Sequence, residues 1–296
     1  YPIMKNVLKS FISENKFFYF LLFPIIKLRS IYSMRYFSNF DKLFSNVVGG
    51  SVTCTVSNIS GRYEIDSRSH ILKEILIKKV YEPDIVNLIK QNTPVNKDAI
   101  NIGANIGLYS NLLAKLINTD KKVLAIEPTP GAFKYLEANI KRNNNCNKII
   151  TYNGIATDVP GLSKINIIEG KEEYSSMGVI THFAVEKEKH ISVDIEGDTI
   201  DNLVTKFNLQ PGIIVIDVEG YEGQVLNGAI ETIRKFKPII ISELDDKLLK
   251  NLNSNTFEIV QLLEVNGYIV TDTENNKLSF PFMGGNIIAS PKSSND

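Results

Sequence analysis

Cysteine is scarce in this sequence, and its two cysteines, Cys54 and Cys146, lie far apart. They form no CxxC pair and no zinc-type spacing, and they build no disulfide framework. The three histidines, His70, His182 and His190, form no HExxH pair. The sequence therefore predicts reduced thiols in a cytoplasmic protein and argues against a structural zinc site.

An excess of charge of one sign is also absent. Lys and Arg together number 33, as do Asp and Glu, so the formal net charge is zero. Domains that bind nucleic acid are usually strongly basic, so we expect no nucleic-acid partner. The hydrophobic fraction of 43% and the charged fraction of 22% are ordinary for a soluble protein. A chain of 296 residues is long enough for one large domain, alone or with an appendage.

Within the first fifty residues, the apolar run at positions 17–26 is too short to cross a bilayer as a helix, which needs about twenty residues. No small-residue cleavage site follows it, which argues against a signal peptide. Two interpretations remain. In the favoured one, residues 1–50 form a helical segment that packs on the core or covers it as a lid. In the other, the segment lies in a membrane interface, making the cytoplasmic protein membrane-associated. The basic residues that would then face anionic headgroups are Lys16, Lys27, Arg29 and Arg35.

Residues 51–98 form the second part of the predicted organisation. Weak alternation over 51–66 indicates a hairpin around Ser60-Gly61, and Pro83 is well placed to begin a lead-in helix through Gln91. The main domain is expected over residues 99–290, and the polar residues 291–296 are expected to be a frayed tail.

From Asp98 onwards, apolar strands alternate with helices. Near-continuous apolar strands in such a pattern are typical of a mostly parallel sheet with helices on both faces. The sequence therefore predicts an α/β fold, doubly wound around a seven-stranded sheet. The predicted strands of this sheet are 99–102, 122–126, 149–152, 213–216, 239–243, 268–271 and 286–289, and the helices are 109–117, 130–143, 199–207, 222–236 and 257–266. Shorter strands are expected at 164–168 and 191–195.

A turn with two glycines lies where the first of these strands meets its helix, at residues 101–107. Ligands of doubly wound sheets bind at such turns. Gly103 allows the backbone to approach a ligand, Asn105 tolerates positive φ, and Gly107 allows close helix–strand packing. A tight structural turn is the alternative. The Gly-x-x-x-Gly spacing differs from the dinucleotide pattern GxGxxG, which disfavours a nucleotide-dependent oxidoreductase.

Acidic residues follow three of the predicted strands. Glu127, followed by Pro128, ends the second strand, where a carboxylate can accept hydrogen bonds from both ribose hydroxyls of an adenosine group. Desolvating several carboxylates after an apolar strand is costly unless they are used, and residues two apart share one side of a strand. Asp217 and Glu219 are therefore expected to face one site. Glu243 ends the neighbouring strand, and Glu222 either joins the site or stabilises the start of the next helix.

Two loop residues are weaker candidates. The polar loop at 172–182 comes after the third strand and is a candidate substrate lid, in which His182 is a possible base or simply a solvated residue. Asp158 is a candidate partner of an adenine amino group, and a plain turn residue is the equal alternative.

Taken in order, these motifs resemble the FkbM family of methyltransferases over roughly residues 80–245. The matching segments are Tyr81-Glu82-Pro83, 102–110, Ile126-Glu127-Pro128, 217–222, Leu226-Asn227-Gly228-Ala229 and 238–243. The resemblance implies a Rossmann-like domain that uses S-adenosylmethionine to methylate oxygen, often on sugars or secondary metabolites. The cofactor-binding residues would be Asn101, Gly103, Asn105, Gly107, Glu127, Pro128, Asp158 and Asp217.

One position departs from the family pattern. The family usually has Asp where this chain has Asn101, and an amide accepts a hydrogen bond from the cofactor's ammonium group with less charge assistance. A degenerate cofactor-binding partner protein is therefore kept as an alternative to the enzyme.

The expected chemistry removes a proton from the acceptor hydroxyl, by a carboxylate base or through a divalent metal ion. Asp217 is the leading candidate for base or metal ligand. Its candidate helpers are Glu219, Glu222 and Glu243, with His182 behind them, and Asp217, Glu219 and Glu243 are the possible metal ligands.

Overall fold

The computed structural model describes residues 49–178 and 189–292. Contacts within the chain define two units, with the boundary between Tyr81 and Glu82. The apolar run at 17–26 lies outside the described residues, so its role as a lid or an interfacial segment stays a prediction. Among the helices that are described, none has the length and apolar character needed to cross a membrane.

The first unit contains the predicted hairpin. Strands β1 (Ser51–Val56) and β2 (Gly61–Asp66) pair antiparallel, and the turn between them contains Ser60 at φ +60°. A helix that the sequence analysis missed, α4 (His70–Lys78), follows and contacts β2. The side chain of Ser69 caps its first turn, which is a usual way for a short helix to begin.

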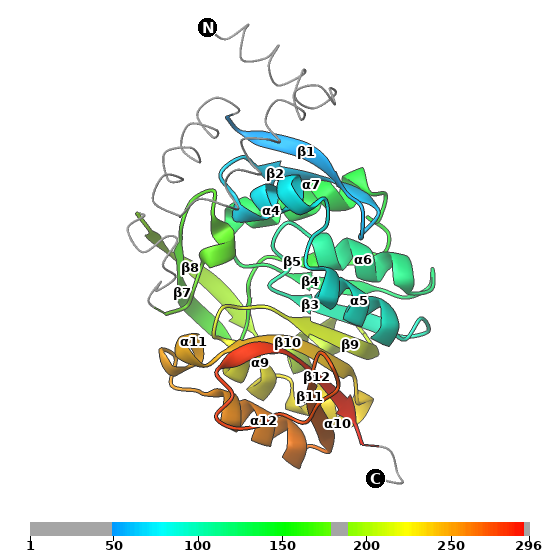
Figure 1. Cartoon of the computed structure of the whole chain (residues 1–296), viewed down its shortest axis with the longest axis vertical. Helices are drawn as coiled ribbons and strands as arrows, with labels where there is room; N and C mark the ends of the chain where they lie inside the picture. Colours follow the sequence, from blue (N-terminus) through cyan, green and yellow to red (C-terminus); the bar gives the residue numbers. More distant parts are fainter. Residues whose placement is uncertain (1–48, 179–188, 293–296) are drawn as a thin grey trace, which may run out of the picture. The chain divides into compact units, whose positions relative to one another are not determined.

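The second unit is the predicted α/β domain (Figure 1). The predicted lead-in helix, α5 (Pro83–Asn92), belongs to this unit and not to the unit that contains the hairpin. The strands of the large sheet are β3 (Asp98–Ile102), β4 (Val123–Ile126), β5 (Ile149–Tyr152), β9 (Pro211–Ile216), β10 (Ile239–Asp245), β11 (Tyr268–Asp272) and β12 (Gly284–Pro291). The helices are α5 (Pro83–Asn92), α6 (Leu108–Leu116), α7 (Pro130–Arg142), α8 (Ile200–Lys206), α9 (Glu222–Asn227), α10 (Ile230–Phe236), α11 (Asp246–Lys250) and α12 (Thr256–Val265).

The large sheet has the strand order β11-β12-β10-β9-β3-β4-β5. Strand β12 pairs antiparallel with both of its neighbours, and the other pairings are parallel. This confirms the predicted mostly parallel, seven-stranded sheet. Along the chain, β3, β4 and β5 follow one another towards one edge of the sheet. β9 then pairs with the opposite side of β3 and begins the other half of the sheet. The strand order therefore reverses between β3 and β9, where doubly wound sheets bind ligands.

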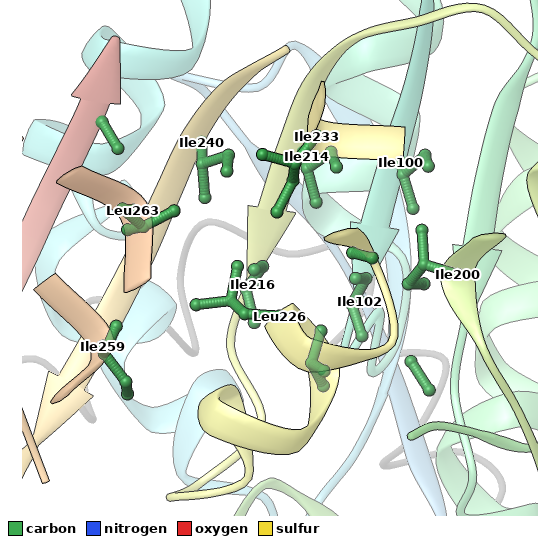
Figure 2. Packing of buried hydrophobic residues seen from close by; sticks show 14 of the residues in the cluster. Ile100, Ile102, Ile200, Ile214, Ile216, Leu226, Ile233, Ile240, Ile259 and Leu263 are labelled. Carbon is green, nitrogen blue, oxygen red and sulfur yellow. The ribbon is translucent and has the colours of Figure 1, made fainter. Parts of the chain in front are cut away.

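Alternation along the strands points Ile100 and Ile102 to one face of the sheet and Asn101 to the other, which we call the functional face. Ile100, Ile102, Ile214, Ile216 and Ile240 all belong to the buried core, which Figure 2 shows between the sheet and the helices beneath it. These helices are α8, α9, α10 and α12, and they contribute core residues such as Leu203, Leu226, Ile233 and Leu263. Helices α5 and α6 contact the strands as well, on the opposite face (Figure 1).

A small sheet separates β5 from α8 in the chain. It has the order β6-β8-β7 and consists of β6 (Ile155–Ala156), β7 (Gly161–Ile167) and β8 (Ile191–Asp198). The predicted short strands at 164–168 and 191–195 are therefore confirmed, as an antiparallel pair. In the described part of the chain, none of these strands pairs with the large sheet.

The single helix predicted over 222–236 is wrong, because the structure divides it into α9 and α10 around Gly228 and Ala229. The carbonyl of Gly228 accepts a hydrogen bond from the backbone N–H of Asp201 (3.0 Å), instead of one from within the helix. The carboxylate of Asp201 then accepts from the first backbone N–H groups of α10, those of Glu231 (3.1 Å) and Thr232 (2.7 Å). A residue from a distant helix thus caps α10, which local periodicity cannot reveal.

Candidate active site

The turn at residues 103–107 has the backbone geometry that its sequence predicts. Asn105 has φ +47°, which confirms the expected positive φ, and Gly103 and Gly107 have φ +76° and +86°. The structure gives a second reason for Gly103, beside the expected approach of a ligand. A Cβ at this position would lie 1.7 Å from the backbone oxygen of Asp217, so the glycine lets the carboxyl ends of β3 and β9 touch. The expected close packing at Gly107 is on a helix and not on a strand. A Cβ on Gly107 would lie 2.7 Å from the side chain of Leu136 on helix α7.

Three buried asparagines that the sequence analysis missed support this turn. The side-chain amides of Asn111 and Asn139 donate to the carbonyls of Gly107 (2.8 Å) and Ile106 (3.0 Å). Asn145 donates in turn to Asn111 (2.8 Å). Buried carbonyls need such donors, so the network fixes the turn from behind. The sequence signal for this network was the number of Asn residues on helices α6 and α7 and directly after α7.

Glu127 is held tightly at the end of β4 and is 5% exposed. Its Oε2 accepts from the backbone N–H of Asn105 (2.7 Å), and its Oε1 accepts from the N–H (2.8 Å) and hydroxyl (2.6 Å) of Thr129. A carboxylate has about four lone-pair sites. Within the described residues, Oε1 accepts two of these bonds and Oε2 accepts one, so Oε2 has more room for a ribose hydroxyl, and the expected pair of ribose bonds stays a prediction.

Neighbouring residues shift the pKa of Glu127 and fix the backbone beside it. Burial raises the pKa of Glu127, its bonds to Thr129 and Asn105 oppose this rise, and the charge of Glu172 adds to it. Asn153, another residue that the sequence analysis missed, donates its side-chain N–H to the carbonyls of Glu127 (2.9 Å) and Pro128 (3.1 Å). The segment around Pro128 is therefore fixed from both sides.

Asn101 lies on the functional face of β3 and is 1% exposed. Its amide nitrogen donates to the hydroxyl of Ser110 on α6 (2.8 Å). Its amide oxygen has no hydrogen-bond partner among the described residues. A buried polar atom without a partner is costly, so a ligand that donates a hydrogen bond to this oxygen would be stabilised there.

The structure brings Asp217 and Glu243 together. The N–H of Asp217 donates to the carbonyl of Ile102 (3.0 Å), so the alternation of β9 continues through Asp217 onto the face of Asn101. Ser242 of β10 pairs with Ile216 of β9, which places Glu243 beside Asp217 at the carboxyl edge. Both carboxylates therefore lie on the face that Asn101 shares.

The expected strand alternation between Asp217 and Glu219 is wrong, although both residues remain in one acidic group. β9 ends at Ile216, and Glu219 has φ +53°, so the backbone turns between the two. Burial raises the pKa of Asp217 well above its usual range, with further contributions from Glu219 and Glu243. Burial raises the pKa of Glu219 to about 8, and the charge of Glu243 is the next largest cause.

Glu222 is placed for the second of its two predicted roles, and its charge also contributes to the raised pKa of Asp217, so the first role stays a prediction. It is the first residue of α9, is 2% exposed, and accepts a hydrogen bond from the backbone N–H of Gly220 (3.3 Å). Burial raises its pKa to about 7. The carboxylate thus supports the turn that carries Glu219, and it influences the site through that turn.

The remaining candidates are Asp158 and the loop at 172–182, which includes His182. Asp158 is exposed after β6 and accepts from the hydroxyl of Thr157 (3.2 Å). His182 lies outside the described residues, so its role stays a prediction. Of the candidate lid, residues 172–178 are described, and Glu172 reaches the start of α7, where a Cβ on Gly131 would lie 2.1 Å from its Oε1.

No three His, Cys, Asp or Glu side chains in the described ranges are arranged to hold a metal ion. The predicted metal ligands Asp217, Glu219 and Glu243 are therefore near one another without forming a ready three-ligand site.

The acidic group predicts an unusual dependence of stability on pH. Carboxyl groups with raised pKa values keep protons in the folded state that the unfolded chain releases. Their contribution to stability is complete below about pH 4.5, the ordinary pKa, and is lost as the pH rises to about 8. We expect the free energy of unfolding to fall between pH 5 and pH 8 and Glu219→Gln to reduce this fall, as measured by urea denaturation. The matched control is Glu258→Gln on the exposed side of α12. An equal slope in the Glu219 variant and the wild type would contradict the assignment.

The fold and this site define a class: a doubly wound α/β protein with a glycine-containing turn at its topological switch point. The family described as Methyltransferase FkbM domain matches residues 101–270. This match covers more than half of the sequence, and the chain therefore belongs to the FkbM methyltransferase family.

The solved structures that match this chain do so at low sequence identity. The methyltransferase FkbM from Methylobacillus flagellatus KT is 18% identical, with a TM-score of 0.43, over 66% of this chain and 43% of that one. This chain thus spans less than half the length of that protein. The precorrin-6y C5,15-methyltransferase from Geobacter metallireducens GS-15 is 18% identical (TM-score 0.40; 72% and 89% covered). The O-methyltransferase from Bacillus cereus in complex with SAH is 14% identical (TM-score 0.39; 70% and 78% covered). The comparison with curated proteins gave no match.

Proposed function

We propose that this methyltransferase binds S-adenosylmethionine at the turn of residues 103–107 and methylates a hydroxyl oxygen of a sugar, glycan or secondary metabolite. One observation carries the proposal. At the point where the strand order reverses, the turn is bonded to the buried carboxylate of Glu127 and touches the backbone of Asp217. This junction offers groups for both ends of the cofactor.

The residues at the junction fit the cofactor's polar groups. The Oε2 atom of Glu127 suits a ribose hydroxyl, and the unpartnered amide oxygen of Asn101 suits the hydrogens of an ammonium group. The bound cofactor would supply a methyl group activated by its attachment to a positively charged sulfur. The rigid turn and its asparagine network would hold the reacting atoms in line, which is a major source of rate acceleration.

Asp217 is the proposed base. A hydroxyl is a poor nucleophile until its proton is removed, and a base works best when its pKa lies near the working pH. Burial and the charges of Glu219 and Glu243 shift the pKa of Asp217 in that direction. Because the described residues offer no three-ligand metal group, we favour a direct base over a metal ion. Glu243, which is more exposed, is positioned to contact a polar acceptor.

Replacing Glu127 tests the cofactor site. Glu127→Ala removes the ribose bonding and the anchor of the Asn105 N–H, and a charge-assisted hydrogen bond contributes about 1.5–3 kcal/mol. We expect the dissociation constant for S-adenosylmethionine to rise at least tenfold, as measured by calorimetry. Glu137→Ala, in the middle of α7, is the matched control. Unchanged affinity in the Glu127 variant would remove the ribose assignment.

Two further measurements separate the alternatives. Titration with NAD should give no heat, whereas binding of NAD in place of S-adenosylmethionine would support an oxidoreductase. Transfer of a labelled methyl group to a panel of glycans and small hydroxyl compounds distinguishes the enzyme from a cofactor-binding partner protein, which would bind without transfer.

A further inference from the structure

Glu82, which has no part in the mechanism above, has an unusual backbone and a directed side chain. It precedes Pro83 at the start of α5 with φ +34° and ψ +67°, a left-handed conformation that is unfavourable for a residue with a Cβ, and more so before proline. Its side chain makes no capping bond to its own helix. Instead, the carboxylate accepts a hydrogen bond from the hydroxyl of Tyr109 on α6.

The topology places Glu82 at the carboxyl edge of the sheet. Beyond the C-terminal end of α5, Pro94 and Lys97 pack against Gly212 at the start of β9, so this end of the helix lies at the amino edge. A helix of ten residues is about 15 Å long, close to the length of a five-residue strand. Since α5 contacts both β10 and α6, its first residue lies near the ends of the strands, on the functional face.

Helix α6 links Glu82 to the cofactor-binding turn. Tyr109, which holds Glu82, is followed directly by Ser110, which accepts the hydrogen bond from Asn101 (2.8 Å). The charge of Glu82 also contributes to the raised pKa of Asp217, which shows that the two carboxylates lie within electrostatic range. Glu82, Asn101 and Asp217 therefore border one region.

We propose that Glu82 is a further cofactor-binding residue whose carboxylate pairs with the ammonium group of S-adenosylmethionine, beside the amide oxygen of Asn101. This inference rests on the proposed function. An ammonium group has three hydrogens to donate and a full positive charge. Asn101 supplies an acceptor and no charge, whereas a carboxylate supplies both. Tyr109 fixes the direction of that carboxylate before the ligand arrives.

The test compares two ligands that differ in the amino-acid portion. S-adenosylhomocysteine carries the ammonium group, and 5′-methylthioadenosine carries the same adenosine and a thioether without it. We expect Glu82→Gln to weaken binding of S-adenosylhomocysteine at least tenfold in calorimetry and to leave binding of 5′-methylthioadenosine unchanged. Tyr109→Phe should cause a smaller loss, and adding it to Glu82→Gln should cause little more.

Controls separate this role from others. Asp84→Asn, an exposed position two residues along α5, should bind both ligands normally. In the Glu82→Gln background, Asn101→Asp should restore part of the affinity by returning a negative charge to the region. Normal affinity of Glu82→Gln for S-adenosylhomocysteine, or an equal loss for both ligands, would overturn the inference. A wild-type protein that binds neither ligand would instead overturn the proposed function.

Discussion

Asp217→Asn is expected to lower the rate of methyl transfer about 10²–10⁴-fold, the usual contribution of a positioned base. The substitution keeps the shape of the side chain and removes its ability to take a proton. Cofactor affinity should change little, because the turn packs on the backbone of Asp217, which the substitution leaves unchanged. The free energy of unfolding should rise slightly at neutral pH, since the variant no longer carries a charge that is costly to desolvate.

Single-turnover rates with labelled cofactor, measured from pH 5 to pH 9, test this expectation. Because the pKa of Asp217 is raised, the wild-type rate should climb with pH as the carboxyl group loses its proton, and the variant should lose this dependence. Asp194→Asn on β8 is a matched control. Near-normal turnover by the Asp217 variant would place the base elsewhere, at Glu219, Glu243 or His182. Loss of wild-type activity with a chelator would point to a metal ion.

Gly103→Ala is expected to abolish cofactor binding and to lower the melting temperature markedly. Alanine at positive φ is unfavourable by itself, at a cost of more than about 1 kcal/mol. Here the added Cβ would also lie 1.7 Å from the backbone oxygen of Asp217, and a backbone atom cannot rotate away as a side chain can. The ends of β3 and β9 must separate, which changes the turn at which we propose that the cofactor binds.

Thermal melting and calorimetry of the purified variant measure both effects. Gly161→Ala offers a control for conformation alone, because Gly161 also has positive φ (+145°) and a Cβ there would meet nothing within 4 Å. If the two alanine variants lost the same stability, close contact between the strand ends would not be the reason for glycine at 103.

Much of the fold was predictable because its signals are local. Runs such as Ile213–Ile216 are apolar throughout, as strands covered on both faces must be, and Pro83 and Pro130 stand at helix starts. The positive φ of Asn105 followed from the few residue types that tolerate it. The placement of acidic residues after strands was enough to bring Asp217 and Glu243 together, since parallel strands end at one edge.

The parts that could not be predicted depend on partners distant in sequence. Asp201 caps α10 from thirty positions away, and nothing in the sequence near Gly228 announces it. Likewise, Thr129 and Asn105 donate three hydrogen bonds to Glu127, and the one from Asn105 comes from 22 positions away. In the asparagine network, Asn111 and Asn139 are polar residues at buried helix positions, which periodicity treats as exposed, and Asn145 joins them from the loop after α7.

The separate pairing of β6, β7 and β8 has an evolutionary consequence. Their hydrogen bonds are exchanged within the small sheet, and Gly228 is fixed to its base, where a Cβ would lie 2.0 Å from the carbonyl oxygen of Thr157. Insertions, deletions or swaps beyond that anchor leave every ladder bond of the large sheet intact. This segment can therefore accept changes in length as a separate module, without altering the pairing of the strands that lead to Asn101, Glu127 and Asp217.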